Sequence, residues 1–382
     1  MVMESMEKLQ VLSQASEWDA GEPGCLERTG RKKTDGIVLT RSVMRGGKTA
    51  ILLKSLLTSY CENNCLYCPF RSGRDFPRAS FAPDEFADLA VNLTRAGLIQ
   101  GVFLSSGVAG SGSITQDRLI STAEILRKKK MYRGYLHLKI MPGSDFDQVF
   151  RAMQLADRVS VNLEAPNGNR LRKLAPEKNF QDALMRPLKW TDFIRRNFSP
   201  QSAWKNRWPT SSTQFVVGGA GETDRELLET TQLLHREHSL ERAYFSAFQP
   251  HHDTPLEDHP ASTYRREQRL YQADYLIRDY GFSGEELIYD PEGHLPVDRD
   301  PKLAWAQENL SDQRIEINSA ERENLLRIPG IGPAGADRII RVRRNGAIRD
   351  LGTLRKWGIH TGRAEKFILL DGRCPTFQPA LF

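Results

Sequence analysis

The chain has no long apolar segment. The hydrophobic run that begins at Ile51 is interrupted by Lys54, and no stretch of about 18 apolar residues occurs anywhere. The first residues include Glu4 and Glu7 but no apolar core ahead of a small-residue cleavage site. We therefore expect no transmembrane helix, no secretory signal, no membrane partner and a cytoplasmic location.

Cysteine is scarce as well. The 382 residues include five cysteines, three of them within Cys61–Cys68, while Cys25 and Cys374 lie far away. This odd number and this clustering argue against a disulfide framework and favour thiolate ligation of a metal in a reducing compartment. Too few cysteines remain for a second cluster, so we interpret Cys25 and Cys374 as ordinary thiols.

Most of the chain has no excess of either charge. The formal net charge is +6, and the segment 319–382 alone holds 12 Lys/Arg against 6 Asp/Glu, an excess of the same size. Hydrophobic residues make up 39% and charged residues 27%, which suits a globular enzyme with a real core. A neutral body with a basic appendage favours a catalytic module joined to a module that binds a polyanion.

Strand and helix patterns alternate through the neutral body. Strand-like runs lie at 51–58, 102–108, 135–141, 158–165, 213–220 and 243–250, with helical patterns at 83–96, 117–129, 145–155, 179–197 and 224–237. This repetition predicts a parallel sheet with helices outside it. Six units are too few to close an eight-fold barrel. We therefore predict an α/β fold, an open partial (β/α)6 barrel with its active site at the carboxyl ends of the strands.

The pattern divides the chain into four regions. We expect an N-terminal extension over 1–50 that opens with a helix near Met3–Ser16, the barrel over 51–255, a helical connector over 256–318 with helices near 262–279 and 301–309, and a small all-α domain over 319–382.

The cysteine triplet directly follows the first predicted strand. Its spacing is C-x3-C-x2-C through Cys61, Cys65 and Cys68. Three thiolates on one tight loop can hold three irons of a [4Fe–4S] cubane and leave the fourth iron open for an exchangeable ligand. The alternatives are a structural zinc loop, which usually needs four ligands, and buried structural cysteines. No fourth ligand lies nearby, since the first histidine downstream is His137.

At this point the chain resembles the radical S-adenosylmethionine (SAM) superfamily, from Ile51 to Pro250. The resemblance implies a [4Fe–4S] cluster and SAM as cofactors, reductive cleavage to a 5′-deoxyadenosyl radical, and an electron donor such as flavodoxin or ferredoxin. It implies SAM contacts by residues at the ends of strands and at the cysteine loop, namely Tyr67, Ser105, Ser106, Gly107, Asn162, Glu164, Val217 and Gly218. The turn at Ser105–Gly107 departs from the commonest Gly-Gly-Glu form of the family.

Each of these secondary signals has a plainer interpretation. A glycine-rich strand end can be a tight turn, Glu164 could pair with Lys139 or Arg158, and Glu222-Thr223 could simply begin the next helix. His251 and His252 follow the sixth strand and are candidate catalytic residues on the substrate side, although a polar loop after a strand is the more common explanation.

The basic segment contains a second motif. Leu325–Ile340 reads as two helices joined by the turn Ile328-Pro329-Gly330-Ile331-Gly332, which closely resembles a helix-hairpin-helix. Glycine permits the backbone angles of such a hairpin, and its N–H groups can cradle a phosphate oxygen. The following helix adds the cationic side chains Arg338, Arg341, Arg343 and Arg344. A degenerate copy follows, with helices at 351–357 and 361–370. The alternative is a hairpin used for packing against a protein.

The combination resembles a family of radical SAM proteins described as acting in DNA modification or repair, often encoded beside a uracil-DNA-glycosylase-like partner. The resemblance covers nearly the whole chain. It implies an enzyme that acts on DNA, with a base leaving the stack to reach the barrel. Two alternatives stay open: an enzyme that modifies tRNA or another RNA, and a DNA-binding protein whose cluster is structural or senses redox state.

Overall fold

A computed structural model describes residues 4–15, 32–34, 37–43 and 49–375. The described residues fall into two compact units. The first holds the residues up to Glu222 together with Leu233–Glu267, and the second holds Thr223–Gln232 together with the residues from Gln268 onward. Each unit is described separately below.

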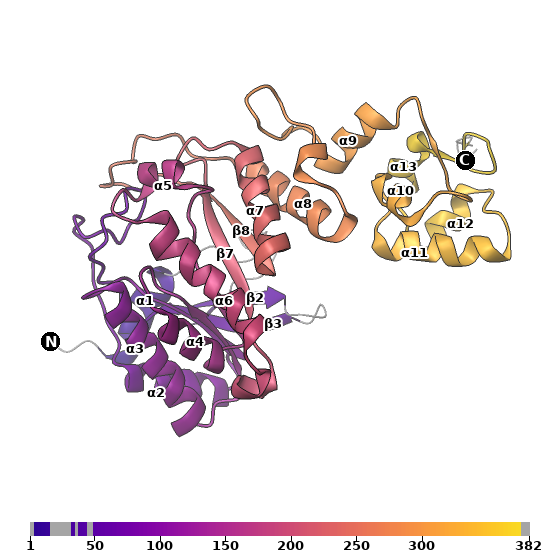
Figure 1. Ribbon diagram of the computed structural model, residues 1–382. Helices are drawn as coiled ribbons and strands as arrows, with labels where there is room; N and C mark the ends of the chain where they lie inside the picture. Colours follow the sequence, from indigo (N-terminus) through magenta and orange to yellow (C-terminus); the bar gives the residue numbers. More distant parts are fainter. Residues whose placement is uncertain (1–3, 16–31, 35–36, 44–48, 376–382) are drawn as a thin grey trace. The chain divides into compact units, whose positions relative to one another are not determined.

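One sheet organises the first unit (Figure 1). Its strands run in spatial order from β1 to β8: β1 (Lys32–Thr34), β2 (Ile37–Val43), β3 (Thr49–Leu56), β4 (Gly101–Ser105), β5 (Tyr135–Lys139), β6 (Arg158–Ser160), β7 (Thr210–Val217) and β8 (Arg242–Ala247). Strands β3 to β8 are all parallel. The predicted α/β partial barrel with six parallel strands is thus confirmed, in the expected order.

The two antiparallel strands β1 and β2 extend the sheet beyond β3. The sequence analysis places no strand before Ile51, so this hairpin is an addition to the prediction. Leu39 of β2 pairs with Leu53 of β3, which buries both side chains. The three residues of β1 carry two lysines and give no hydrophobic alternation to detect.

The helices of the first unit cover the sheet, and all but α1, which precedes β1, follow a strand in the chain (Figure 1). They are α1 (Ser5–Ala15), α2 (Pro83–Arg95), α3 (Gly112–Glu124), α4 (Phe146–Leu155), α5 (Gly168–Leu174) and α6 (Arg186–Asn197), while α7 (Asp224–His238) and α8 (Tyr264–Tyr280) span the division between the units. Helix α4 begins where it does because Asp145 and Gln148 form a capping box. Helix α2 buries one apolar face, including Phe86 and Ala90.

The two faces of the parallel strands differ in polarity. In β5, Leu136 and Leu138 are fully buried, while the alternate residues Tyr135, His137 and Lys139 occupy the other face. The outer face therefore supplies the hydrophobic core beneath the helices, and the inner face of the barrel is polar.

A buried ion pair anchors the beginning of β6. The Arg127 side chain, 4% exposed, lies 2.8 Å from a carboxylate oxygen of Asp157. Its other nitrogens donate to the carbonyls of Leu155, Tyr132 and Gly134 at 3.0, 2.8 and 2.9 Å. Arg127 lies in a π-helical turn, Ile125–Lys129, that ends the α3 region. Every charge in this contact is satisfied by a specific partner, as a buried charge requires.

The second unit has its own small core. Helices α9 (Pro301–Asn309), α10 (Arg322–Arg327), α11 (Pro333–Val342), α12 (Leu351–Lys356) and α13 (Thr361–Ala364) surround it, with a short parallel pair of β9 (Ile315–Glu316) and β10 (Ile368–Leu369). Its centre includes Leu325, Ile339 and Leu354, all fully buried. The predicted helix over 361–370 is wrong in its second half, because a single 3-10 turn follows α13 and Ile368-Leu369 pair as a strand.

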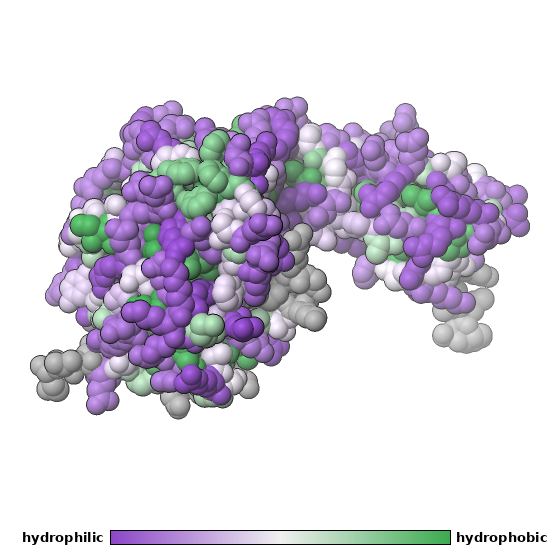
Figure 2. Space-filling view, turned by 60° about the horizontal axis from the view of Figure 1, so that its bottom comes forward, coloured by the Kyte–Doolittle hydropathy of each residue, from purple (hydrophilic) through white to green (hydrophobic). Residues whose placement is uncertain are grey.

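Among the described residues no helix combines the length and the apolar character that crossing a membrane requires. The face shown in Figure 2 is mainly hydrophilic, with apolar side chains in separate small groups. Such scattered exposure is ordinary for a globular protein.

Candidate functional site

The three cysteines lie on one loop between β3 and α2. Cys65 is buried, Cys61 and Cys68 are partly exposed, and all three are free thiols. The loop is folded on itself, since the N–H of Cys68 donates to the carbonyl of Cys65 at 3.2 Å. Burial raises the pKa of the Cys65 and Cys68 thiols, so a metal that binds here must displace their protons.

The three free thiols on one loop match the ligand set of a [4Fe–4S] cluster. In such a cluster each cysteine binds its own iron, so three thiolates hold three of the four irons.

The turn after β4 lies directly against the cysteine loop. The N–H of Gly107 donates to the carbonyl of Thr58 at 2.7 Å, and that of Val108 donates to Cys61 Sγ at 3.4 Å. A Cβ on Gly107 would lie 2.3 Å from the carbonyl oxygen of Tyr60, so only glycine fits. Val108 is a contact that the sequence analysis missed, because a backbone donor leaves no trace in residue type.

Two of the predicted SAM contacts lie at the end of β4, Ser105 as its last residue and Ser106 directly after it. Ser105 is buried, and Ser106 Oγ is a buried atom without a hydrogen-bond partner. An unpaired buried hydroxyl is uncommon and indicates a group that a ligand satisfies. The structure thus brings Ser105, Ser106 and Gly107 beside the cysteine loop, as expected of residues that line a cofactor there.

Tyr67, Glu164 and Lys178 form a polar cluster at the same loop. Burial, and next the charge of Glu164, raise the pKa of Tyr67 well above its usual value. Lys178 Nζ lies 3.6 Å from a carboxylate oxygen of Glu164, and both side chains are about nine-tenths buried. Tyr67 and Glu164, predicted separately from the sequence, are therefore neighbours.

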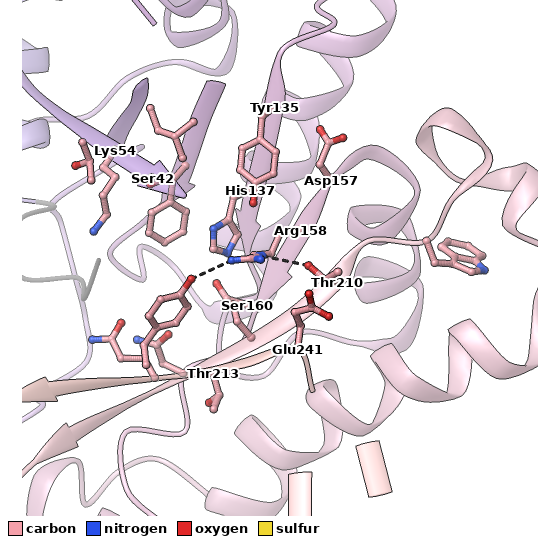
Figure 3. Close-up of a pocket in the computed structure, with 18 of the residues that line it drawn as sticks. Ser42, Lys54, Tyr135, His137, Asp157, Arg158, Ser160, Thr210, Thr213 and Glu241 are labelled. Atoms are coloured by element: carbon pink, nitrogen blue, oxygen red, sulfur yellow. Dashed lines mark hydrogen bonds between the residues drawn. The ribbon is translucent and has the colours of Figure 1, made fainter. Parts of the chain in front are cut away.

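Glu164 has an unusual backbone. Its φ of 64° lies in the left-handed region that glycine favours, and it continues the β6 strand only as an isolated bridge to Phe215. Strained, buried polar residues are concentrated at functional sites because the surrounding structure must hold them in place. Asn162, two residues earlier, lines a cavity inside the barrel (Figure 3). Glu164 and Asn162 thus lie two residues apart along the same wall of the barrel.

Lys178 is a functional candidate that the sequence analysis left without a role. The segment that carries it is fixed to the cysteine loop, since the N–H of Leu66 donates to the carbonyl of Leu174 at 2.7 Å. Burial would lower the pKa of Lys178, but the negative charges of Cys65 and Glu164 outweigh burial and raise it. The side chain therefore stays cationic next to the cluster ligands.

Removing this charge should lower the reduction potential of the cluster. We expect a Lys178→Met variant to shift the midpoint potential downward on the order of 100 mV, the Coulomb energy of one charge several ångströms away at an effective dielectric constant of about 20. Electron paramagnetic resonance during a redox titration measures the shift. Lys173→Met, on the exposed side of α5, is the matched control. An unchanged potential in Lys178→Met would show that Lys178 acts only in packing.

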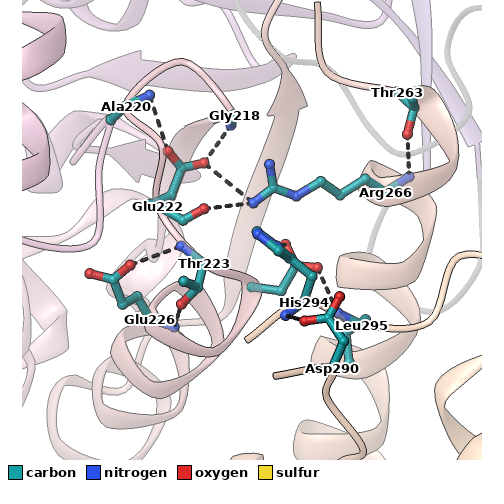
Figure 4. A network of polar contacts seen from close by, with 11 residues as sticks. Gly218, Ala220, Glu222, Thr223, Glu226, Thr263, Arg266, Asp290, His294 and Leu295 are labelled. Atoms are coloured by element: carbon teal, nitrogen blue, oxygen red, sulfur yellow. Dashed lines mark hydrogen bonds and ion pairs between the residues drawn. The ribbon is translucent and has the colours of Figure 1, made fainter. Parts of the chain in front are cut away.

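The turn after β7 is held by Glu222 (Figure 4). The Glu222 carboxylate accepts the N–H groups of Gly218 and Ala220, and Arg266 donates to the Glu222 carbonyl at 2.8 Å. Gly218 has a φ of 93°, and a Cβ there would lie 2.8 Å from the Ser262 side chain. Val217 is the last residue of β7 and is fully buried. Glu222 therefore fixes the shape of the turn that the sequence analysis associates with SAM.

His251 and His252 follow β8. His251 is partly buried, and burial, followed by the charge of Arg74, lowers its pKa. His252 is exposed, and its carbonyl accepts from Arg74 Nε at 3.0 Å. Arg74 follows the cysteine loop in the chain, so both histidines lie near the loop's distal end. Their catalytic role stays a prediction.

The glycine hairpin of the second unit has the expected left-handed backbone at Gly330 but not at Gly332, whose φ of −103° is open to any residue. Gly330 has a φ of 88°, and a Cβ there would lie 2.5 Å from the carbonyl oxygen of His360 in the second hairpin. The two hairpins are also joined by a hydrogen bond of 3.3 Å from His360 N–H to the Gly330 carbonyl. Gly332 begins α11 without a side-chain cap, which leaves the N–H groups of that first turn available.

Two further residues support this hairpin. Lys302 donates to the carbonyl of Ile331 at 2.5 Å and lies 4.5 Å from the ring centre of Tyr280. Burial lowers the pKa of Lys302 to about 7. The Ile331 side chain is in the core, so only its backbone can face a ligand.

The arginines of α11 and of the 3-10 turn Arg343–Asn345 that follows it divide into two kinds. Arg338, Arg341 and Arg344 are exposed. Arg343 instead donates to the carbonyls of Ile317 and Ala320 at 2.9 and 2.6 Å and is part of the fold. The three exposed arginines remain candidates for phosphate contact.

Comparison with known proteins gives a family match over slightly less than half of the chain. Residues 55–234 match the sequence profile described as the Radical SAM superfamily. A tRNA-2-methylthio-N(6)-dimethylallyladenosine synthase from Thermoanaerobacter sp. (strain X514) is 27% identical over 181 residues, which cover 46% of this chain and 36% of that protein. An uncharacterized protein from Methanocaldococcus jannaschii is 22% identical over 215 residues, covering 53% of this chain and 50% of that protein. The chain thus spans from about a third to half of the length of these curated relatives.

Solved structures share the arrangement more loosely. The [FeFe]-hydrogenase maturase HydG has a TM-score of 0.46 and 12% identity, covering 59% of this chain and 49% of that one. Methylornithine synthase (PylB) has a TM-score of 0.44 and 16% identity, covering 59% of this chain and 61% of that one.

Proposed function

Because residues 55–234 place this chain in the radical SAM superfamily, we propose that it cleaves SAM reductively at the cysteine loop and acts on nucleic acid, with DNA as the first candidate. The superfamily match confirms the cofactors expected from the sequence, a [4Fe–4S] cluster on Cys61, Cys65 and Cys68, and SAM. When bound, these cofactors supply a 5′-deoxyadenosyl radical that abstracts hydrogen from a substrate.

The residues of this chain would hold and orient those groups. The three cysteines hold the cluster, and the Val108 N–H donates to Cys61 Sγ, an outer contact of the kind that tunes a metal site. Ser106 offers its unpaired hydroxyl beside the loop. Lys178 places a buried positive charge next to the ligands, and the Glu222 carboxylate keeps the Gly218 turn in shape.

The proposal of a nucleic-acid substrate rests on the second unit. Its single strongest support is the Gly330 hairpin, where a positive φ and the close approach of His360 exclude any larger residue. Uncapped N–H groups at the start of a helix suit a phosphate oxygen. The charge excess of the segment 319–382 and the exposed Arg338, Arg341 and Arg344 add attraction to a phosphate backbone. The electron donor, such as flavodoxin or ferredoxin, and a uracil-DNA-glycosylase-like partner stay predictions, as does a cytoplasmic location.

A second candidate function is the modification of tRNA. It is favoured by the 27% identity, over 181 residues, to a protein named for its action on a tRNA adenosine. The chemistry of the first unit would be the same, and only the polymer would differ. Duplex DNA and tRNA, compared for binding at two salt concentrations, separate the two candidates.

A glycine substitution tests the hairpin. We expect Gly330→Ala to weaken binding to duplex DNA about tenfold or more, because the new Cβ would collide with the His360 carbonyl and deform the phosphate cradle. Fluorescence anisotropy measures the affinity. Gly362→Ala in α13 meets no atom within 4 Å and is the matched control. Formation of 5′-deoxyadenosine from SAM should be equal in both variants.

A second, independent experiment removes a positive charge and leaves the backbone of the hairpin unchanged. Replacing Arg341 with glutamine should reduce the slope of log affinity against log salt by about one and leave folding unchanged. If neither Gly330→Ala nor Arg341→Gln alters binding to DNA or tRNA, the hairpin serves protein packing and the nucleic-acid proposal is wrong.

A further inference from the structure

A large cavity lies inside the barrel (Figure 3). Its volume is about 480 Å³, within the range of small-molecule sites. Residues at the beginnings of the strands, such as Tyr135 and Thr210, form one end, while residues further along, such as His137, Ser160 and Gln214, form the walls. The cavity therefore occupies the part of the barrel towards the amino ends of its strands, away from the loops that follow the carboxyl ends.

The walls are polar where a barrel is normally packed with branched apolar side chains. On β5, β6 and β7 the inward positions are His137, Arg158, Ser160, Ser212 and Gln214. The alternate, outward positions of β5 and β6, namely Leu136, Leu138 and Val159, belong to the hydrophobic core. A hollow and polar interior costs packing energy, so it indicates a binding function.

Two hydroxyl groups in these walls lack partners. Ser160 is 5% exposed and Ser212 is fully buried, and the Oγ atoms of both are buried without a hydrogen-bond partner. Buried polar atoms are nearly always paired. Two orphaned hydroxyls on adjacent strands that line one cavity therefore point to a ligand with several acceptor atoms.

The charge of the lining is positive. The basic lining residues are Lys54, Arg158, Lys205 and Arg207, and the acidic ones are Asp157 and Glu241. Asp157 is already neutralised, because it pairs with Arg127 at 2.8 Å and with Lys205 at 3.0 Å. Lys54 is 7% exposed, so its charge lies deep in the cavity.

Two hydrogen bonds fix the orientation of the Arg158 guanidinium in this cavity (Figure 3). It donates to Thr210 Oγ1 at 3.1 Å and to the Tyr244 hydroxyl at 2.9 Å. A guanidinium fixed in this way needs no ordering when an anion arrives. Its planar set of donors matches the oxygens of a phosphate.

We infer that this cavity binds the phosphate group of a single nucleotide unit. Arg158 and Lys54 supply the charge, and the Ser160 and Ser212 hydroxyls donate to the remaining oxygens. The assignment of this phosphate to a nucleotide rests on the proposed function. The phosphate can come from a free mononucleotide or from a nucleotide of a polymer.

The cavity also sets the direction of the bound unit. Arg158 and Asn162 face the cavity from one wall, and four residues of extended chain span roughly 13 Å. Glu164, beside Tyr67 and Lys178, comes two residues later. A nucleotide whose phosphate lies at Arg158 therefore extends its sugar and base towards the cysteine-loop end of the barrel.

Calorimetry on the full-length protein with its cluster and SAM bound tests the inference. The probes are thymidine 5′-monophosphate, thymidine and a thymidine trinucleotide. We expect the monophosphate to bind about tenfold or more tightly than thymidine, because charge-assisted hydrogen bonds are lost with the phosphate. Arg158→Gln and Lys54→Met should each remove that preference, and Arg133→Gln, at an exposed position, should retain it. Lys54 and Arg158 lie on different strands, so a folding defect in one variant leaves the other as the test.

The outcomes are distinct. Equal affinities for thymidine and its monophosphate, or a preference that survives in a folded Arg158→Gln or Lys54→Met variant, would overturn the inference. Displacement of the monophosphate by the trinucleotide supports the cavity and assigns the phosphate to a polymer, while failure to displace it assigns the site to free nucleotides. If binding follows the expectation but 5′-deoxyadenosine is never formed, the proposed function fails and the cavity assignment stands. If SAM cleavage and DNA binding are intact without a phosphate preference, only the cavity assignment fails.

Discussion

Replacing Cys68 with alanine is expected to remove the iron–sulfur cluster and to abolish formation of 5′-deoxyadenosine from SAM. Each of the three cysteines holds a separate iron, so the loss of one ligand leaves the cubane without a stable attachment. Iron analysis should fall from about four atoms per chain to near zero, and the visible absorption of the cluster should disappear. Cys61→Ala and Cys65→Ala should behave in the same way.

The chain offers a matched control for this experiment. Cys374 is an exposed thiol in the second unit. Cys374→Ala should keep the iron content, the absorption and the product of the parent protein. A Cys68→Ala variant that retains a full cluster would show that the metal is held elsewhere and would remove the basis of the assignment.

Substitution of Arg127 by methionine should cause the largest loss of stability. The change leaves Asp157 buried beside the beginning of β6 with one of its two cationic partners missing, and it leaves the carbonyls of Leu155, Tyr132 and Gly134 without their donor. Breaking a buried ion pair from one side costs about 3–5 kcal/mol. Because Lys205 still pairs with Asp157 at 3.0 Å, we expect about 3 kcal/mol.

Urea denaturation followed by circular dichroism measures this loss. Lys128→Met is the control from the same turn, since its exposed pair with Glu124 contributes about 1 kcal/mol at most. The double variant Arg127→Met with Asp157→Asn should recover part of the stability, because it removes the negative charge of Asp157 that has lost its Arg127 partner. A loss below 1 kcal/mol in Arg127→Met would mean that water already enters this contact.

The strands of the barrel were predictable because their signal is local. Each run is apolar, and a helical pattern separates it from the next. The ends of the strands were harder to predict from the sequence. The run 158–165 was predicted as one strand, yet regular pairing ends at Ser160, and Glu164 adopts a left-handed backbone. Nothing in the residue types indicates that conformation, since glutamate seldom adopts it.

The same distinction applies to the site. The cysteine spacing lies within eight residues and could be read directly. Lys178 could not, since its role depends on a hydrogen bond between Leu66 and Leu174, more than a hundred residues apart. The β1–β2 hairpin is a different case, because the β-branched and apolar residues of β2 are typical of a strand and only β1 gives no local signal.

The contact between Gly107 and the cysteine loop has a consequence for how the protein acquires its metal. Gly107 bonds to Thr58 on the β3 side of the loop, and Val108 reaches Cys61, so the loop obtains its shape from the pairing of β3 with β4. Small zinc domains fold only when the metal arrives. Here two backbone hydrogen bonds from the β4 side, made by Gly107 and Val108, contribute to the shape of the loop. We therefore expect iron and sulfide to restore the cluster in the purified apoprotein without a refolding step.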